Sequence, residues 1–393
     1  MNPSHPHPAG PLARLGSLLF LSATILAGGP AGAQGVGSLM WSSGPDLPSP
    51  RTEAAAVLAS DNAVLLLGGS SPAGETVVPK LANGAAAWTT APDLDISRIT
   101  PGATRFGAQG ILVYGGLHGG EATDEALLYD YYLADSQDAE KLSVPRQHFA
   151  FASDSSGRAY AIGGVEEPGQ RLSSAERYLP NSDTWEDIAS LPVALSGACA
   201  VGVGATHIYV LGGETAAGIR DTVYRYTIAS DSWSSITPLL TPVRDSAAVL
   251  SQDRIYVLGG VSPTGPVDTV QVYDLTTGLW STDALPAARR GHAAVVTASG
   301  TILVAGGFDA AGLPSASVFQ TQQLNLPETA PVFNTAPVTN GSLDRPYSYD
   351  AGAVGNPPPT YSLVTAPAGM GIDAASGLIS WQPGPGQVGS QAV

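Results

Sequence analysis

The chain has 393 residues, 44% of them hydrophobic, and 33 acidic against 17 basic residues give it a formal charge of −16 at pH 7. Its length exceeds the roughly 150 residues of an average domain, so we expect one large domain and a smaller one. Nucleic-acid binding draws most of its affinity from clustered lysine and arginine, so the acidic balance argues against a nucleic-acid partner.

The N-terminus has the pattern of a secretory signal peptide. Arg14 precedes an apolar segment from Leu15 to Ala27, and Ala31-Gly32-Ala33 follows as a small-residue cleavage site. The apolar segment is too short and interrupted to indicate a membrane span. The sequence therefore predicts a signal peptide over residues 1–33, no transmembrane segment after its cleavage, and a secreted, periplasmic or cell-surface protein.

From residue 64 onward the sequence repeats a run of four apolar residues followed by two glycines. The phrase "IYVLGG" stands unchanged at Ile208 to Gly213 and at Ile255 to Gly260. The six copies end at Gly69, Gly116, Gly164, Gly213, Gly260 and Gly307, with intervals of 47, 48, 49, 47 and 47 residues. A fixed period of this size indicates a repeat architecture.

Each repeat predicts four short strands: an alanine-rich strand, the apolar quartet, a strand with a tyrosine and a strand with a tryptophan. The spacing between the two aromatic residues recurs in Tyr178 and Trp185, Tyr226 and Trp233, and Tyr273 and Trp280. In the second repeat Ser136 replaces the tryptophan. Because the quartets do not alternate with polar residues, both faces of each sheet are expected to be covered, as in sheets stacked around an axis.

This pattern resembles the kelch repeat, whose family fold is a β-propeller, over about residues 36 to 325. The expected fold is all-β, with a six-bladed kelch propeller over residues 34–325. The sixth repeat has a strand around Phe319 but no tryptophan strand, whereas an unattached tryptophan strand surrounds Trp41. An unpaired edge strand is an aggregation hazard, so we expect the N-terminal strand to close the sixth blade, as is common in propellers of the kelch type.

Residues 326–393 form a linker and a second domain of different composition, in which the glycine pairs stop and short alternating strands with turns appear. The phrase "YSLVTAPAGMGIDAASGLISWQP" resembles the dystroglycan-type cadherin-like group of bacterial immunoglobulin-like domains. The resemblance implies a small β-sandwich. One or two more strands usually follow in that group, so this domain is expected to be incomplete.

The best candidate site is a ring of residues that begin equivalent strands, two positions after an arginine. The ring comprises Glu53, Thr100, His148, Gly197, Ser246 and His292, with Arg51, Arg98, Arg146, Arg244 and Arg290 close behind and Leu195 in place of one arginine. Each of these residues alone is more economically explained by hydrogen bonds to the strand connections. As a set they predict a ligand-binding mouth, because the kelch resemblance implies that peptides or sugars dock near this position. Arg146, Arg244 and Arg290 favour a carboxylate or sulfate on the ligand.

The sequence favours a monomeric binding protein with an unknown protein or glycan ligand over an enzyme. The alternative is a carbohydrate-active enzyme on the same scaffold: a sugar mutarotase or epimerase with Glu53 and either His148 or His292 as acid and base, or a copper oxidase of the galactose-oxidase type. The single cysteine, Cys199, excludes an intramolecular disulfide framework and is expected to be a small core residue. The histidines lack ligand spacing, so no metal or other cofactor is predicted.

Overall fold

The computed structural model describes residues 39–321, apart from 108–109, 133–134 and 168, and short segments of the rest, which are 13–14, 329–333, 340–341, 347–350, 353–356, 361–363, 366–374, 377–384 and 387. The chain separates into two compact units, residues 36–324 and a unit made of residues 325–393 with 1–35. Of the predicted signal peptide, only strand β1 (Ala13–Arg14) lies within the described residues. Across those residues, no helix is long and apolar enough to cross a membrane.

The larger unit consists of six antiparallel four-stranded sheets. Their innermost strands are β3 (Ala55–Leu58), β7 (Gly102–Phe106), β13 (Ala150–Ser153), β19 (Cys199–Val203), β25 (Ala247–Ser251) and β31 (Ala293–Val296). The second strands are β4 (Val64–Leu67), β8 (Gly110–Tyr114), β14 (Ala159–Ile162), β20 (His207–Leu211), β26 (Arg254–Leu258) and β32 (Ile302–Ala305). The second strands carry the apolar quartets, which are buried throughout, as strands covered on both faces must be.

The remaining strands form the outer half of each sheet. The third strands are β5 (Val78–Leu81), β11 (Ala126–Asp130), β17 (Ala175–Leu179), β23 (Val223–Thr227), β29 (Thr269–Asp274) and β33 (Val318–Thr321). The outer strands are β6 (Thr89–Ala91), β12 (Asp135–Ala139), β18 (Thr184–Ile188), β24 (Ser232–Ser235), β30 (Leu279–Ala284) and β2 (Trp41–Ser43). The last sheet has the order β2-β33-β32-β31, so its outer strand comes from the beginning of the chain.

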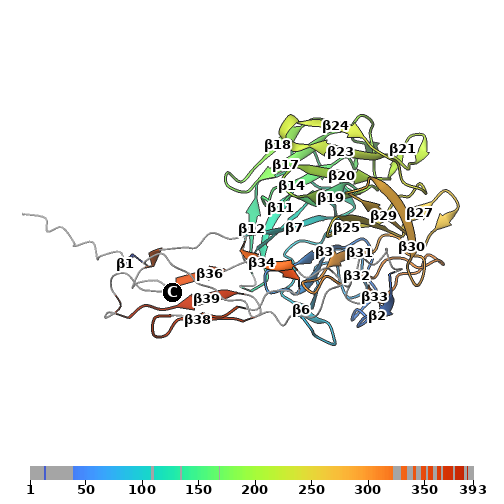
Figure 1. Cartoon of the computed structure of the whole chain (residues 1–393). Coiled ribbons are helices and arrows are strands. Elements are labelled where there is room, and N and C mark those ends of the chain that lie inside the picture. Colours follow the sequence, from blue (N-terminus) through green and yellow to red (C-terminus); the bar gives the residue numbers. More distant parts are fainter. Residues whose placement is uncertain are drawn as a thin grey trace, which may run out of the picture. The chain divides into compact units, whose positions relative to one another are not determined.

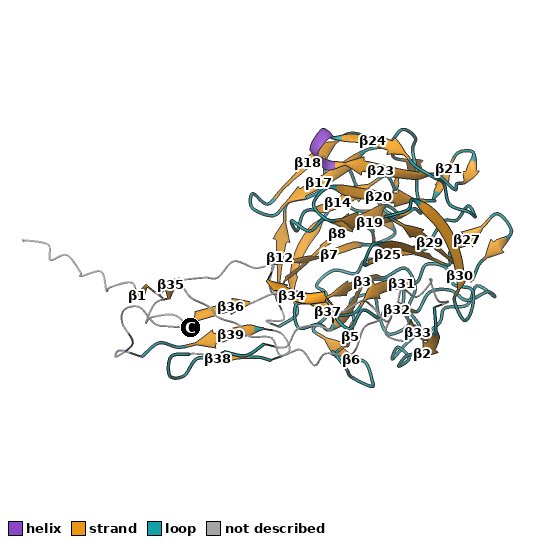
Figure 2. Cartoon of the chain, in the orientation of Figure 1, coloured by secondary structure: helices purple, strands orange, loops and turns teal. Residues whose placement is uncertain are grey.

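The six sheets are arranged around a central axis as the blades of a propeller (Figures 1 and 2). Each innermost strand lies beside the next, and β31 of the last sheet lies beside β3 of the first. Within the described residues the only helix is one 3₁₀ turn, η1 (Ile228–Ser230). The prediction of an all-β, six-bladed propeller is therefore confirmed.

The repeated glycine pair joins neighbouring blades. Gly68 has a φ of 64°, and a Cβ atom added there would lie 2.4 Å from the Arg98 carbonyl oxygen of the next blade. Gly69 donates its N–H to the same carbonyl at 2.7 Å. The equivalent bond recurs at every blade boundary and ends with Gly307 N–H donating to the Arg51 carbonyl at 2.8 Å, from the sixth blade to the first. Only a residue without a side chain permits this approach.

The tryptophans join neighbouring blades at the rim. Trp185 Nε1–H donates to the Glu140 carbonyl of the preceding blade at 2.9 Å, and the indoles of Trp88, Trp233 and Trp280 make the same kind of bond. Ser136 removes this link from the second blade, and there the Tyr129 hydroxyl donates instead to the Pro92 carbonyl of the first. One missing ring therefore leaves the blade arrangement intact.

The described strands of the smaller unit form three separate sets. β1 pairs with β35 (Asn340–Gly341), and β34 (Thr329–Phe333) pairs with β37 (Ala353–Asn356). β36 (Tyr347–Asp350), β39 (Leu378–Trp381) and β38 (Gly371–Ile372) form a three-stranded sheet. Much of residues 326–393 lies outside the described residues, so the immunoglobulin-like sandwich remains a prediction.

Candidate functional site

The innermost strands are preceded by a ring of residues with left-handed backbone conformation. The ring consists of Glu53, Thr100, His148, Gly197, Asp245 and Gly291, with φ values from 49° to 64°. Glycine adopts this conformation freely, whereas other residues pay about 1–2 kcal/mol for it. Four of the six blades thus hold a side chain where the backbone favours glycine.

Main-chain hydrogen bonds connect these residues around the axis. Glu53 N–H donates to the Gly291 carbonyl at 2.7 Å, and Thr100 N–H donates to the Glu53 carbonyl at 2.9 Å. The same bond links Gly197 to His148, Asp245 to Gly197 and Gly291 to Asp245, at 2.8 to 2.9 Å. The sixth junction differs, because His148 N–H lies 3.4 Å from the Thr100 hydroxyl. The ring is therefore held together mainly by main-chain hydrogen bonds.

The structure corrects two of the predicted ring residues. Ser246 and His292 lie one residue beyond the ring, and Asp245 and Gly291 take the positions predicted for them. The Ser246 hydroxyl lies 3.4 Å from the Cys199 thiol. His292 is buried in the blade, and burial, aided by the nearby Arg289, lowers its pKa to about 3. Its imidazole is therefore a neutral core group.

The blade arginines are structural. Arg51, Arg98, Arg146 and Arg289 are buried, and each donates from Nη1 to the carbonyl of the first glycine of its own blade, 17 residues later. Leu195 and Val243 stand at this position in the fourth and fifth blades. Arg146 also forms a fully buried ion pair with Glu176 at 2.5 Å. The prediction that Arg146 faces a ligand is wrong, because no part of its side chain reaches solvent.

Arg244 and Arg290 occupy the next position along the chain, immediately before the ring. The side chain of Arg244 is 36% exposed and forms ion pairs with Asp245 and, at 4.0 Å, with Glu214. The Arg290 guanidinium lies 4.0 Å from the centre of the Phe308 ring. The pairing of Arg244 with two carboxylates weakens the predicted preference for an anionic ligand, since its charge is already neutralised.

Glu53 and His148 are the ring residues with free polar groups. Among the described residues, no hydrogen bond or ion pair involves the Glu53 carboxylate or the His148 imidazole. Burial raises the pKa of Glu53; His148 and Arg290 act to lower it and Asp245 to raise it, so all three lie within electrostatic range. A carboxylate that is partly buried without a protein partner is available to a ligand.

Two-stranded ribbons stand beside the ring. They are β9 (Leu117–His118) with β10 (Glu121–Ala122), β15 (Val165–Glu166) with β16 (Gln170–Arg171), β21 (Glu214–Thr215) with β22 (Gly218–Ile219), and β27 (Val261–Ser262) with β28 (Gly265–Pro266). The first residue of each ribbon forms a β-bridge with the residue before the ring, as Val165 does with Gln147. These ribbons therefore gather at the ring end of the channel.

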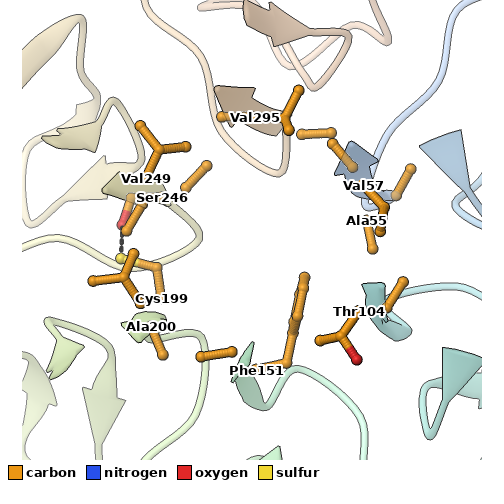
Figure 3. A pocket seen from close by; sticks show the side chains of 18 of the residues that line it. Ala55, Val57, Thr104, Phe151, Cys199, Ala200, Ser246, Val249 and Val295 are labelled. Atoms are coloured by element: carbon orange, nitrogen blue, oxygen red, sulfur yellow. Dashed lines mark hydrogen bonds between the residues drawn. The ribbon is translucent and has the colours of Figure 1, made fainter. Parts of the chain in front are cut away.

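The ring opens into a central channel of about 430 Å³, lined by all six innermost strands. Alanine and valine are the most frequent residues of its wall, and Figure 3 shows the Phe151 ring extending into the channel. The sequence analysis missed Asp245 and Phe151. Phe151 could have been recognised from the sequence, because the equivalent position in each of the other five alanine-rich strands holds an alanine.

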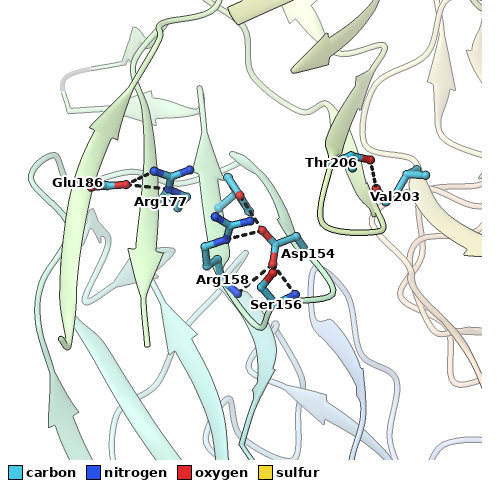
Figure 4. Close-up of polar contacts among 8 residues, drawn as sticks. Asp154, Ser156, Arg158, Arg177, Glu186, Val203 and Thr206 are labelled. Carbon is cyan, nitrogen blue, oxygen red and sulfur yellow. Dashed lines mark hydrogen bonds and ion pairs between the residues drawn. The ribbon is translucent and has the colours of Figure 1, made fainter. Parts of the chain in front are cut away.

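A network of polar contacts surrounds Asp154, which follows the innermost strand β13 (Figure 4). The Asp154 carboxylate accepts hydrogen bonds from Ser156 N–H at 2.8 Å, from Arg158 Nε at 2.6 Å and from the Tyr160 hydroxyl at 2.8 Å. Asp154 thus holds a strand connection together, in contrast to the unpartnered Glu53.

Cys199 has the environment of an inert thiol. Its Sγ lies 3.7 Å from the Leu211 carbonyl, and burial raises its pKa to about 11. Within the described part of the chain, no three His, Cys, Asp or Glu side chains lie close enough together to hold a metal ion.

Comparison with known proteins identifies the repeat. Residues 147–328 match the family model described as the KLHDC2/KLHL20/DRC7 Kelch-repeats domain. Kelch-like protein 35 of Mus musculus is 42% identical over 83 residues, which are 21% of this chain and 14% of that protein. Kelch-like protein 21 of Danio rerio is 28% identical over 79 residues, 20% of this chain and 13% of that protein.

The solved structure titled "Structure of YjhT" superposes with a TM-score of 0.61 at 18% sequence identity. The alignment covers 70% of this chain and 95% of that one. At this identity the likeness shows the fold alone. Together these comparisons confirm the predicted kelch repeats and the propeller, and they leave the ligand open.

Proposed function

We propose that this kelch-repeat propeller is a secreted or cell-surface interaction protein that binds a protein ligand at the ring end of its channel. The observation that carries the proposal is the ring itself. Glu53, Thr100 and His148 hold a left-handed conformation that glycine would adopt without strain, and backbone strain of this kind is concentrated at functional sites. A concave mouth with a few convergent polar groups is also the usual form of a ligand site.

Capture of partners by the full chain tests this proposal. Immobilised protein should retain specific secreted or surface proteins from the source organism, and Glu53→Ala with His148→Ala should abolish retention at an unchanged melting temperature. Glu186→Ala, which removes a partly exposed carboxylate of β18 on the rim, is the matched control. Retention that survives the ring substitutions would place binding elsewhere, and saturable binding on a glycan array alone would make the ligand a glycan.

A second candidate function is sugar mutarotation. Glu53 and His148 lie within electrostatic range of each other beside an open channel, as an acid and a base acting on one sugar would. Polarimetry with reducing sugars and the full chain tests it. Turnover that is lost in Glu53→Gln would favour the enzyme, and the absence of rate acceleration would rule it out for those sugars.

Three further features of the protein belong to the proposal. Residues 1–33 support secretion by their signal-like order, and N-terminal sequencing of exported protein should start at Gln34. The pairing of Trp41 with Thr321 supports closure of the propeller by the N-terminal strand. Residues 326–393 are proposed to form an immunoglobulin-like appendage on the strength of their sequence resemblance.

A further inference from the structure

One level of the channel wall below the ring is built almost entirely from alanine. Three positions after the ring, each innermost strand contributes the residue that pairs with the third apolar residue of the quartet. At this level stand Ala56, Ala103, Phe151, Ala200, Ala248 and Ala294. Five blades thus leave room at this level and the third fills part of it with an aromatic ring, which makes this level of the channel apolar and asymmetric.

Phe151 is positioned to contact an incoming group. Its side chain is partly buried, packs edge-on against Phe149 with centroids 6.4 Å apart, and extends into the channel (Figure 3). The Cys199 thiol and the Ser246 hydroxyl are hydrogen-bonded to each other, and Thr104 lines the channel near Phe151 (Figure 3). An apolar group of a ligand that reaches this level would gain contact with Phe151.

The charge at the channel entrance is negative on its inner side. Glu53 and Asp245 belong to the ring, while Arg244 and Arg290 stand one residue farther out and are held by Asp245, Glu214 and the Phe308 ring. The Glu53 carboxylate is the inner charge without a protein partner among the described residues. A cation placed above the channel would supply the missing partner, and the net charge of −16 favours its approach.

We infer that the ligand is a protein segment that inserts an aromatic or large aliphatic side chain into the channel and places a neighbouring lysine or arginine on Glu53. This inference rests on the proposed function and specifies its ligand class. Phe151 is the contact for the apolar side chain, and Glu53 is the contact for the basic one.

Selection from a phage-displayed random peptide library on the immobilised full chain tests the inference. The enriched peptides should pair an aromatic or large aliphatic residue with an adjacent basic residue. For a synthetic peptide of that kind, Glu53→Gln should weaken binding about tenfold, because a charge-assisted hydrogen bond is lost. Phe151→Ala, which installs the residue of the other five blades, should weaken it about fivefold.

The controls separate failure of the inference from failure of the proposed function. Glu186→Gln should leave the peptide's affinity unchanged, and circular dichroism should show that each variant keeps its fold. Enriched peptides that are acidic, or whose affinity depends on Thr100 and His148 but on neither Glu53 nor Phe151, would overturn the inference and leave the binding mouth standing. A chain that enriches no peptide at the ring would overturn both.

Discussion

Replacing ring residues by glycine should stabilise the protein while destroying its binding site. Glu53 is the cleanest position, because its φ is 59° and its carboxylate has no partner among the described residues. Left-handed backbone costs a residue with a Cβ atom about 1–2 kcal/mol, and glycine returns about 0.5–1 kcal/mol of this through its freer unfolded chain. Glu53→Gly should therefore be more stable than Glu53→Ala by about 0.5–1 kcal/mol.

Comparing glycine with alanine at one position isolates the backbone effect, because both substitutions delete the same carboxylate. For a propeller of this size the difference corresponds to about 1–4 °C in melting temperature, measured by calorimetry. Ser234, an exposed residue of β24 with ordinary backbone conformation, should give the opposite order, with alanine the more stable. If Glu53→Gly melts no higher than Glu53→Ala, the ring is not strained and the argument for function from strain collapses.

Four further results are expected. Arg146→Val should lower the free energy of unfolding by about 3–5 kcal/mol in chemical denaturation, because it leaves the Glu176 carboxylate buried without its ion-pair partner. Adding Glu176→Gln should recover much of the loss, because the double variant has the valine and glutamine that the fifth blade carries at the same positions, Val243 and Gln271. An unchanged denaturation midpoint in the single variant would contradict the pair's role. Cys199 should resist thiol reagents at pH 8 until the protein unfolds, because burial raises its pKa to about 11; fast labelling of native protein would refute this. Binding of a basic peptide, followed by calorimetry, should be strongest with Glu53 ionised and should fall as pH drops through its raised pKa, at a higher pH than for an ordinary glutamate; an affinity that rises toward acid would reverse the assignment. Deleting residues 34–45 should lower the melting temperature well beyond ordinary trimming, since β33 would lose its neighbour β2, and a deletion that melts like the parent would show that β2 closes nothing.

The blades were predictable because their marker is a backbone requirement. Each glycine pair lets a neighbouring carbonyl approach to a distance that no side chain permits, as at Gly68, so every blade must keep it. The arginine is a weaker marker, because the buried position it fills accepts Leu195 and Val243 as well. Aligning Arg244 with the blade arginines shifted the predicted ring residue of the fifth blade from Asp245 to Ser246. Aligning Arg290 instead of Arg289 shifted that of the sixth blade from Gly291 to His292.

For the sixth blade the correct spacing was nevertheless present in the sequence. Arg51, Arg98 and Arg146 each stand 17 residues before the first glycine of their blade, and Arg289 does so in the sixth. Counting back from the glycines would have placed Gly291 in the ring of the sixth blade, but it would have missed Asp245, because Val243 stands only 16 residues before Gly259. The charges around Glu53 could not be predicted in this way, because they come from blades far apart in the chain and meet only when the propeller closes.

The hydrogen-bonded ring also bears on how the mouth can change during evolution. Five of its six junctions use only main-chain atoms, so the diameter of the opening does not depend on which side chains point from it. Mutations at Glu53, His148 or Asp245 can therefore exchange one recognition chemistry for another while the aperture stays the same width. The exception is the junction between Thr100 and His148, where a hydroxyl replaces the carbonyl at 3.4 Å. That seam is where the aperture can widen, and a lineage that alters Thr100 would change the size of its ligand as well as its charge.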